Sequence, residues 1–164
     1  MSRTELLVTG LVVGVMGVVA GVAVMTARTH TRDVTRIAQI REIQMGLELH
    51  FQGASAYPIA SEPLALGTAL TACLSADGFS APCGEGSAST YLASVPTPPD
   101  AGLDELSSCG GAANAFCYSA TSDAYRVTFE LERANAALGL TKGLNCATED
   151  DVKPGACEAL SSGE

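Results

Sequence analysis

Apolar residues dominate the chain from Leu6 to Ala27, a stretch that contains no charged side chain. At about 1.5 Å per residue, a helix of this length extends about 33 Å, and the hydrocarbon core of a bilayer is about 30 Å thick. The apolar core of a secretory signal peptide is shorter, at about 7–15 residues. The pattern therefore predicts a retained helix that spans a membrane once.

Glycines recur within this stretch at intervals of four, three and four residues. They are Gly10, Gly14, Gly17 and Gly21. Residues at this spacing lie on one face of a helix, and small residues let helix backbones approach closely in lipid. Glycine is also generally frequent in membrane helices. The regular spacing favours a helix that packs against other helices through this face.

The pattern becomes amphipathic after Ala27, with no proline before Pro58. Apolar residues then recur every three or four positions, as expected for one face of a helix. They include Val34, Ile37, Ile40, Ile43, Leu47 and Phe51. Pro58 disfavours helix at the residue before it. We therefore expect one helix with a transmembrane half, residues 1–27, and an amphipathic half, residues 28–53.

Residues 54–164 form an expected separate head that is strongly acidic, with four basic and fourteen acidic side chains. This charge argues against nucleic acid as a partner, because binding to nucleic acid needs neutralising Lys and Arg side chains. No phosphate-binding loop, zinc-protease motif or nucleophile elbow occurs. The only histidines, His30 and His50, both fall on the predicted helix. We therefore expect no enzymatic activity and no catalytic residues.

All six cysteines lie in the head. They are Cys73, Cys83, Cys109, Cys117, Cys146 and Cys157. An even number in a small domain behind a membrane segment predicts disulfides in an oxidising compartment. Six cysteines allow fifteen pairings, and their clustering in three close couples favours Cys73–Cys83, Cys109–Cys117 and Cys146–Cys157. A zinc site is disfavoured because no C-x-x-C pair occurs.

The clearest strand of the head covers 125–132, where apolar and polar residues alternate. With 115–119 it predicts an antiparallel hairpin, whose apolar face is the natural partner of the amphipathic helix. A short extended segment is expected at 90–96. Residues 59–89 are expected to form a surface connection with a short helix at 64–74. The tail, 139–164, is expected to be loop-like.

Three consecutive acids in the tail are candidate calcium ligands, because hard cations bind clustered carboxylates. They are Glu149, Asp150 and Asp151. Their spacing matches no EF-hand, and a run of charges is usually a solvated surface. No other cofactor is expected.

Several of these features together resemble the type IV pilin and type II secretion pseudopilin family. Glu5-Leu-Leu-Val8, at the start of the apolar helix, is similar to the E-L-L-V of that family. The residues from Arg32 to Phe51, followed by Tyr57-Pro58, are similar to its outer helix and the turn that ends it. The segments 90–96 and 125–132 are similar to strands of pseudopilin-like heads.

The resemblance implies an α+β fold, with a long N-terminal α-helix packed on a small antiparallel β-sheet of three or four strands. It implies subunits held in the bacterial inner membrane, which assembly machinery extracts into a helical homo-oligomeric filament. In that family the glutamate matching Glu5 pairs with the N-terminal amine of a neighbour during assembly. Prepilins carry a glycine before their cleavage point, whereas Met1-Ser-Arg-Thr4 precedes Glu5 here. Some secretion pseudopilins also bind calcium in their C-terminal loops.

A second interpretation is a single-pass, membrane-anchored extracytoplasmic binding domain that does not polymerise. The orientation of the chain is also open to two interpretations. Arginines at 28, 32, 36 and 41 would place the head in the cytoplasm by the positive-inside rule. The expected disulfides and the resemblance place it outside, and we follow these.

Overall fold

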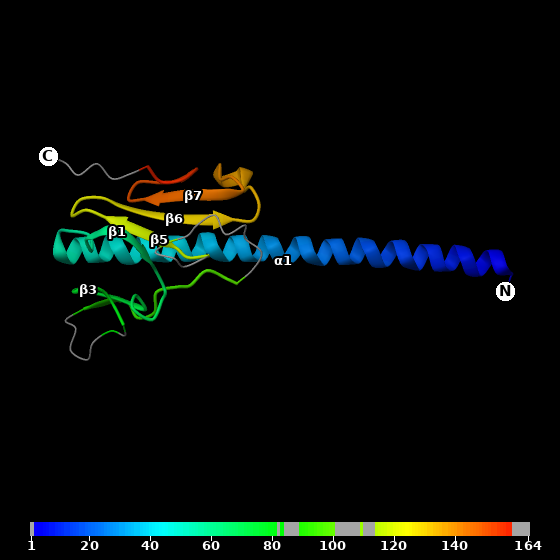
Figure 1. The fold of residues 1–164 in the computed structure, drawn as a ribbon, viewed down its shortest axis with the longest axis horizontal. Coiled ribbons are helices and arrows are strands. Elements are labelled where there is room, and N and C mark those ends of the chain that lie inside the picture. Colours follow the sequence, from blue (N-terminus) through cyan, green and yellow to red (C-terminus); the bar gives the residue numbers. More distant parts are fainter. Residues whose placement is uncertain (1, 82, 84–88, 101–108, 110–113, 159–164) are drawn as a thin grey trace. The chain divides into compact units, whose positions relative to one another are not determined.

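The computed structural model describes residues 2–81, 83, 89–100, 109 and 114–158, and these form two compact units. The first unit, Met1–Arg32, is helical, and the second, Asp33–Glu164, is an α+β head. Helix α1 runs from Arg3 to Ala54 (Figure 1). The expectation of one helix through both halves is therefore confirmed. Its end at Ala54 precedes Ser55, which adopts a positive φ of 55°.

The head contains a five-stranded antiparallel sheet in the order β1-β5-β6-β7-β8. Its strands are β1 (Ala60–Ala65), β5 (Cys117–Ala120), β6 (Tyr125–Leu131), β7 (Gly143–Thr148) and β8 (Val152–Pro154). The expected hairpin is confirmed, since β5 and β6 pair antiparallel in the register Tyr118–Val127. Strands β1 and β8 form the two edges, and each contains a proline.

A second, three-stranded sheet has the order β3-β2-β4. Its strands are β2 (Cys73–Ser75), β3 (Gly78–Ser80) and β4 (Thr90–Leu92). Figure 1 shows the five-stranded sheet along one side of the head segment of α1 and β3 on another side. The ring of Phe79 on β3 contacts Tyr118 on β5 at 5.1 Å between centroids, so the two sheets share one core.

The core joins the head segment of α1 to strand β6. Ile40, Ile43 and Leu47 are fully buried in one cluster with residues of β6. Those residues of β6 are Tyr125, Val127, Phe129 and Leu131. Removing such side chains from water stabilises the fold by about 1.5–3 kcal/mol each. The expected partnership between the helix face and the hairpin is therefore confirmed.

A buried ionic cluster fixes the beginning of the head segment of α1 against the end of β6. Arg36, 1% exposed, lies 3.0 Å from Asp33 and 2.8 Å from Glu132. Its other terminal nitrogen donates to the carbonyl of Pro99 at 3.1 Å. Asp33 also accepts hydrogen bonds from the backbone N–H groups of Glu132 and Arg133. These contacts satisfy charges whose burial would otherwise be costly.

Three disulfides close short loops within the head. They join Cys73 to Cys83, Cys109 to Cys117 and Cys146 to Cys157. These are the pairs that the spacing of the cysteines favoured. The two cysteines of each couple are 8 to 11 positions apart, a separation for which the chain-entropy account gives roughly 2–3 kcal/mol of stability.

The structure corrects the expectation for 59–89. The short helix expected at 64–74 is absent, because β1 extends to Ala65 and a turn follows. Gly67 has φ +72°, and a Cβ there would meet the carbonyl of Pro96 at 2.7 Å. Thr71 stabilises the turn by donating its hydroxyl to the carbonyl of Ala65 at 2.8 Å. The part of 59–89 that the structure describes therefore contributes strands to both sheets and is more than a surface connection.

The tail and the size of the sheet also differ from expectation. The described part of 139–164 is not loop-like, because it forms β7 and β8. Strand β7 pairs along its whole length with β6, from Leu131–Gly143 to Arg126–Thr148. The large sheet therefore has five strands, where the resemblance implied three or four.

Candidate functional site

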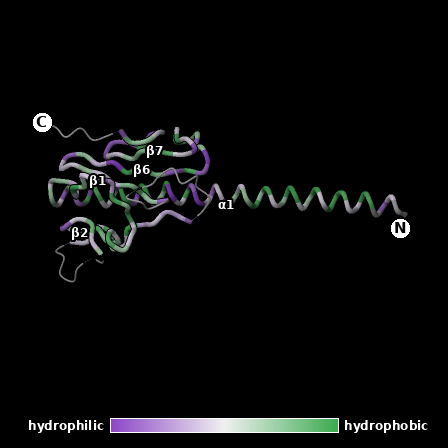
Figure 2. Tube along the Cα trace, viewed as in Figure 1, coloured by the Kyte–Doolittle hydropathy of each residue, from purple (hydrophilic) through white to green (hydrophobic). Residues whose placement is uncertain are grey.

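The N-terminal half of α1 consists largely of hydrophobic residues, as the colouring by hydropathy in Figure 2 shows. Between Leu7 and Met25, twelve large hydrophobic side chains are 48–74% exposed. An exposed apolar surface of this extent indicates contact with lipid or with other protein chains. By length and composition the helix is able to cross a membrane, and a signal sequence has the same features.

The four glycines of this half face open space within the chain. A Cβ built at Gly10, Gly14, Gly17 or Gly21 meets no atom within 4 Å. In contrast, a Cβ at Gly46 in the head would lie 2.6 Å from the side chain of Leu92. Glycine lowers helix stability by about 1 kcal/mol relative to alanine in water. No contact within the described residues therefore explains why glycine, and not a larger residue, occupies these four positions.

Glu5 takes part in a capping box at the beginning of α1. The backbone N–H of Ser2 donates to Oε2 of Glu5 at 2.7 Å, and the backbone N–H of Glu5 donates to the Ser2 hydroxyl at 3.3 Å. Two N–H groups that the helix leaves without a partner are thereby satisfied. This role was not expected from the sequence, although Ser-x-x-Glu before an apolar run is its usual signal.

Both histidines lie on α1. His50 is buried, its Nδ1 lies 2.9 Å from the carbonyl oxygen of Ala56, and its ring packs edge-on against Tyr91. These contacts give His50 a structural role at the end of α1. His30 is exposed and belongs to the other compact unit.

The candidate calcium ligands lie in the connection between β7 and β8. Oδ1 of Asp151 accepts from the backbone N–H of Val152 at 2.7 Å, so this carboxylate supports the turn. Glu149 and Asp150 are exposed. Within the described residues, no group of three or more His, Cys, Asp or Glu side chains is arranged to hold a metal ion.

Tyrosine rings fill the part of the core nearest the end of α1. The rings of Tyr57 and Tyr125 are 4.8 Å apart, and Tyr118 donates its hydroxyl to the carbonyl of Pro58 at 2.8 Å. Burial raises the pKa of Tyr118 and of Tyr125 well above the ordinary value of a phenol, because it disfavours the charged form. These hydroxyls therefore stay neutral at physiological pH.

Comparisons of the chain with protein-family models, curated proteins and solved structures found no match. The structure itself defines a general class, namely proteins with an α+β head, three disulfides and a long apolar N-terminal helix. No narrower family is assigned.

Proposed function

We propose that this chain is a structural subunit of a type IV pilus or type II secretion pseudopilus, which assembles through its N-terminal helix. One observation carries the proposal. Helix α1 exposes an apolar surface with four open glycines over its first half, and its second half, Asp33–Ala54, forms the core of a folded head. This division allows many copies to associate through one end of the helix.

The energetics of the apolar half support association. Each of its large side chains gains about 1.5–3 kcal/mol when it leaves water for lipid or for neighbouring helices. Glycine positions 10, 14, 17 and 21 let two helix backbones approach closely, which strengthens packing in an apolar medium. A subunit held first in a bilayer and then in a helical bundle satisfies this surface at both stages.

The three disulfides support an extracytoplasmic head, because disulfides persist in oxidising compartments. In line with the family resemblance, we propose a single span in a bacterial inner membrane before assembly, and a periplasmic or extracellular filament afterwards. Its partners are copies of itself and the inner-membrane assembly machinery. The acidic head does not favour direct contact with nucleic acid.

In this proposal Glu5 has a role both in the subunit held in the membrane and in the assembled filament. In the single chain its carboxylate accepts from the backbone N–H of Ser2. A carboxylate near the edge of a membrane is costly without a partner. In a filament, the amine of a neighbouring subunit would replace the backbone N–H as the partner of Glu5.

The second candidate is a membrane-anchored extracytoplasmic binding domain that stays monomeric. The capping box favours it, because Ser2 already satisfies the Glu5 carboxylate and no neighbour is needed. This candidate leaves the open glycines without a role.

The deciding experiment compares Gly14→Leu with Val12→Leu in cells that produce the protein. Two residues apart on a helix, the positions lie on nearly opposite faces. We expect Gly14→Leu to abolish filaments seen by electron microscopy, while Val12→Leu retains them. Immunoblots of the membrane fraction check that both variants are produced equally.

Filaments of normal number and length from the Gly14→Leu variant would refute assembly through the glycine face. If the wild-type protein stays monomeric in the membrane and forms no filaments, the anchored-domain candidate stands in place of the pilin proposal.

A further inference from the structure

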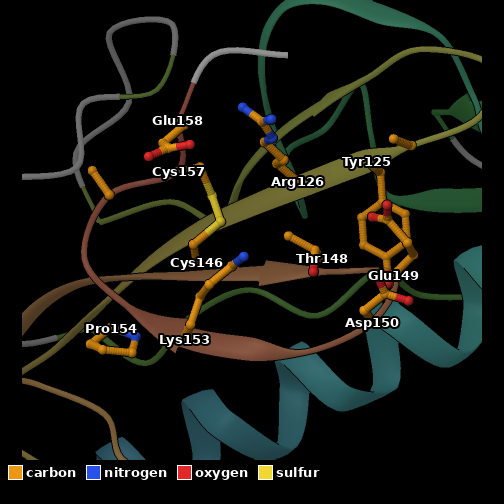
Figure 3. Close-up of a pocket in the computed structure, with 12 residues that line it drawn as sticks. Tyr125, Arg126, Cys146, Thr148, Glu149, Asp150, Lys153, Pro154, Cys157 and Glu158 are labelled. Atoms are coloured by element: carbon orange, nitrogen blue, oxygen red, sulfur yellow. A yellow bond between two sulfur atoms is a disulfide. The ribbon is translucent and has the colours of Figure 1, made fainter. Parts of the chain in front are cut away.

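A pocket of about 350 Å³ lies on the face of the large sheet that points away from α1. Along β6, Tyr125 and Val127 point into the core, so Arg126 between them lies on the opposite face. Arg126 pairs with Thr148 of β7, and Cys146 of β7 pairs with Lys153 of β8. These four residues therefore share the outer face and line the pocket (Figure 3).

The Cys146–Cys157 disulfide gives the pocket a second wall. It ties the segment after β8 back to the centre of β7. Ala156, Cys157 and Glu158 consequently line the pocket as well. Figure 3 shows Cys157 joined to Cys146 by the disulfide. The volume lies within the range of about 300–1,000 Å³ that is usual for small-molecule sites.

Arg126 has a buried nitrogen without a partner. Its Nη1 atom is inaccessible to solvent and makes no hydrogen bond. A buried polar atom left in this state costs about 1–3 kcal/mol, and more when the group is charged. Nearly all such atoms in native proteins have a partner. Because this atom is inaccessible, a ligand in the pocket would contact the guanidinium through its other nitrogens, and Arg126 as a whole is half-buried.

The charges around the pocket narrow the chemistry of the ligand that it could hold. Residues 54–164 carry only four cationic side chains, and two of them, Arg126 and Lys153, line this pocket. Among the described residues, neither forms an ion pair with a carboxylate. Glu149, Asp150 and Glu158 also line the pocket and would repel a ligand with several negative charges.

We propose that this pocket binds a small ligand through one carboxylate group, to which Arg126 and Lys153 donate hydrogen bonds. Arginine presents a planar fork of donors that matches a carboxylate. The acidic side chains accept hydrogen bonds from hydroxyl or ammonium groups on the rest of the ligand. Acidic sugars and free amino acids both have this chemistry. The inference goes beyond filament assembly and does not depend on it.

Titration calorimetry of the full chain in detergent micelles tests the proposal with three probes. Glucuronate represents acidic sugars, alanine represents amino acids, and glucose is the control without a carboxylate. We expect glucuronate or alanine to bind at millimolar concentration and glucose to give no signal. The carboxylate probe that binds identifies the source of the ligand.

Two arginine variants with the same charge change test the site. Arg126→Gln is expected to weaken binding about tenfold or more, since it removes a hydrogen bond to a charged group. Arg133→Gln, at an exposed arginine outside the pocket, is expected to bind as the wild type does. Thermal unfolding of both variants checks that the head still folds.

Arg126→Lys provides a second variant should Arg126→Gln fail to fold. It keeps the charge and is expected to lose part of the affinity, because an ammonium lacks the planar fork. No binding of either carboxylate by the wild type overturns the proposal, and so does equal binding by wild type and the Arg126 variants. These results leave the test of filament assembly unaffected.

Discussion

Arg36 and Glu132 form a buried ion pair, with Nη1 of Arg36 2.8 Å from Oε1 of Glu132. The two residues are 96 positions apart, so the pair joins the helix to the far end of β6. Asp33 contacts the same guanidinium at 3.0 Å. The stability of the head should therefore depend strongly on this arginine.

Replacing Arg36 with methionine is expected to destabilise the head by about 3–5 kcal/mol, because two carboxylates lose their buried cation. Urea unfolding of the full chain in micelles measures the effect. Arg133→Met is the control, since its side chain is exposed and a surface change usually costs less than about 0.5 kcal/mol. Equal unfolding midpoints for the two variants would contradict this role of Arg36.

Gly46→Ala is expected to destabilise the head by about 1–3 kcal/mol through overpacking, because the new Cβ would lie 2.6 Å from Leu92. This cost opposes the gain in helix propensity, about 1 kcal/mol. In a Leu92→Ala background the contact is gone, so Gly46→Ala should stabilise the head instead. A double-mutant cycle of unfolding free energies checks this change of sign. Additive effects would refute the contact.

Stability should fall as pH rises above about 10, the ordinary pKa of a tyrosine hydroxyl. Burial raises the pKa of Tyr118 in the folded state, so the unfolded chain loses this proton first. The stabilisation is present below the unfolded pKa and declines above it. Urea midpoints measured between about pH 8 and pH 11 should show this decline. Tyr118→Phe should make it shallower, and identical slopes for both proteins would argue against a contribution from Tyr118.

Ser2→Ala should weaken the first turn of α1 by about 0.5–2 kcal/mol, because the cap is lost. Amide hydrogen exchange of that turn should become roughly two- to thirtyfold faster. Glu5→Gln should keep the turn protected, since glutamine also completes a capping box.

The same Glu5→Gln variant separates the two proposed roles of this residue. Lost filaments with a protected first turn would show that assembly needs the charge. Normal filaments would show that the carboxylate serves only as a cap.

The long elements of the fold were predictable because their periodicity extends over many residues. The apolar and amphipathic patterns placed α1, and the alternation from Tyr125 to Leu131 placed β6. Close spacing along the chain also indicated the disulfide pairs, such as Cys109–Cys117.

The shorter strands gave no comparable signal. Strands β2, β3, β4 and β8 have three residues each, too few for a period to appear. Strand β7 is longer but has a polar residue, Asn145, at a fully buried position. Its amide donates to the carbonyls of Thr141 and Gly143 and accepts from the Thr141 N–H. Because this local network satisfies the buried amide, a polar residue can occupy a core position. The alternation of apolar and polar residues that indicates a strand is therefore interrupted.

The two candidate sites, the glycine face and the outer pocket, also differ in how far the sequence indicates them. The glycine face depends on spacing within one helix, so the sequence was enough to suggest it. The outer pocket depends on the register that places Arg126 beside Thr148 and on the disulfide that folds the tail back. Register between distant strands comes from tertiary pairing, and neither β7 nor β8 was expected from the sequence.

The prolines at the two edges of the large sheet have a consequence for how copies of the head behave when crowded. Pro63 on β1 and Pro154 on β8 each remove a backbone donor, and a charged residue, Glu62 or Lys153, precedes each proline. Such edges resist pairing with a strand of another molecule. Concentrated heads are therefore protected from joining sheet to sheet into amyloid-like aggregates.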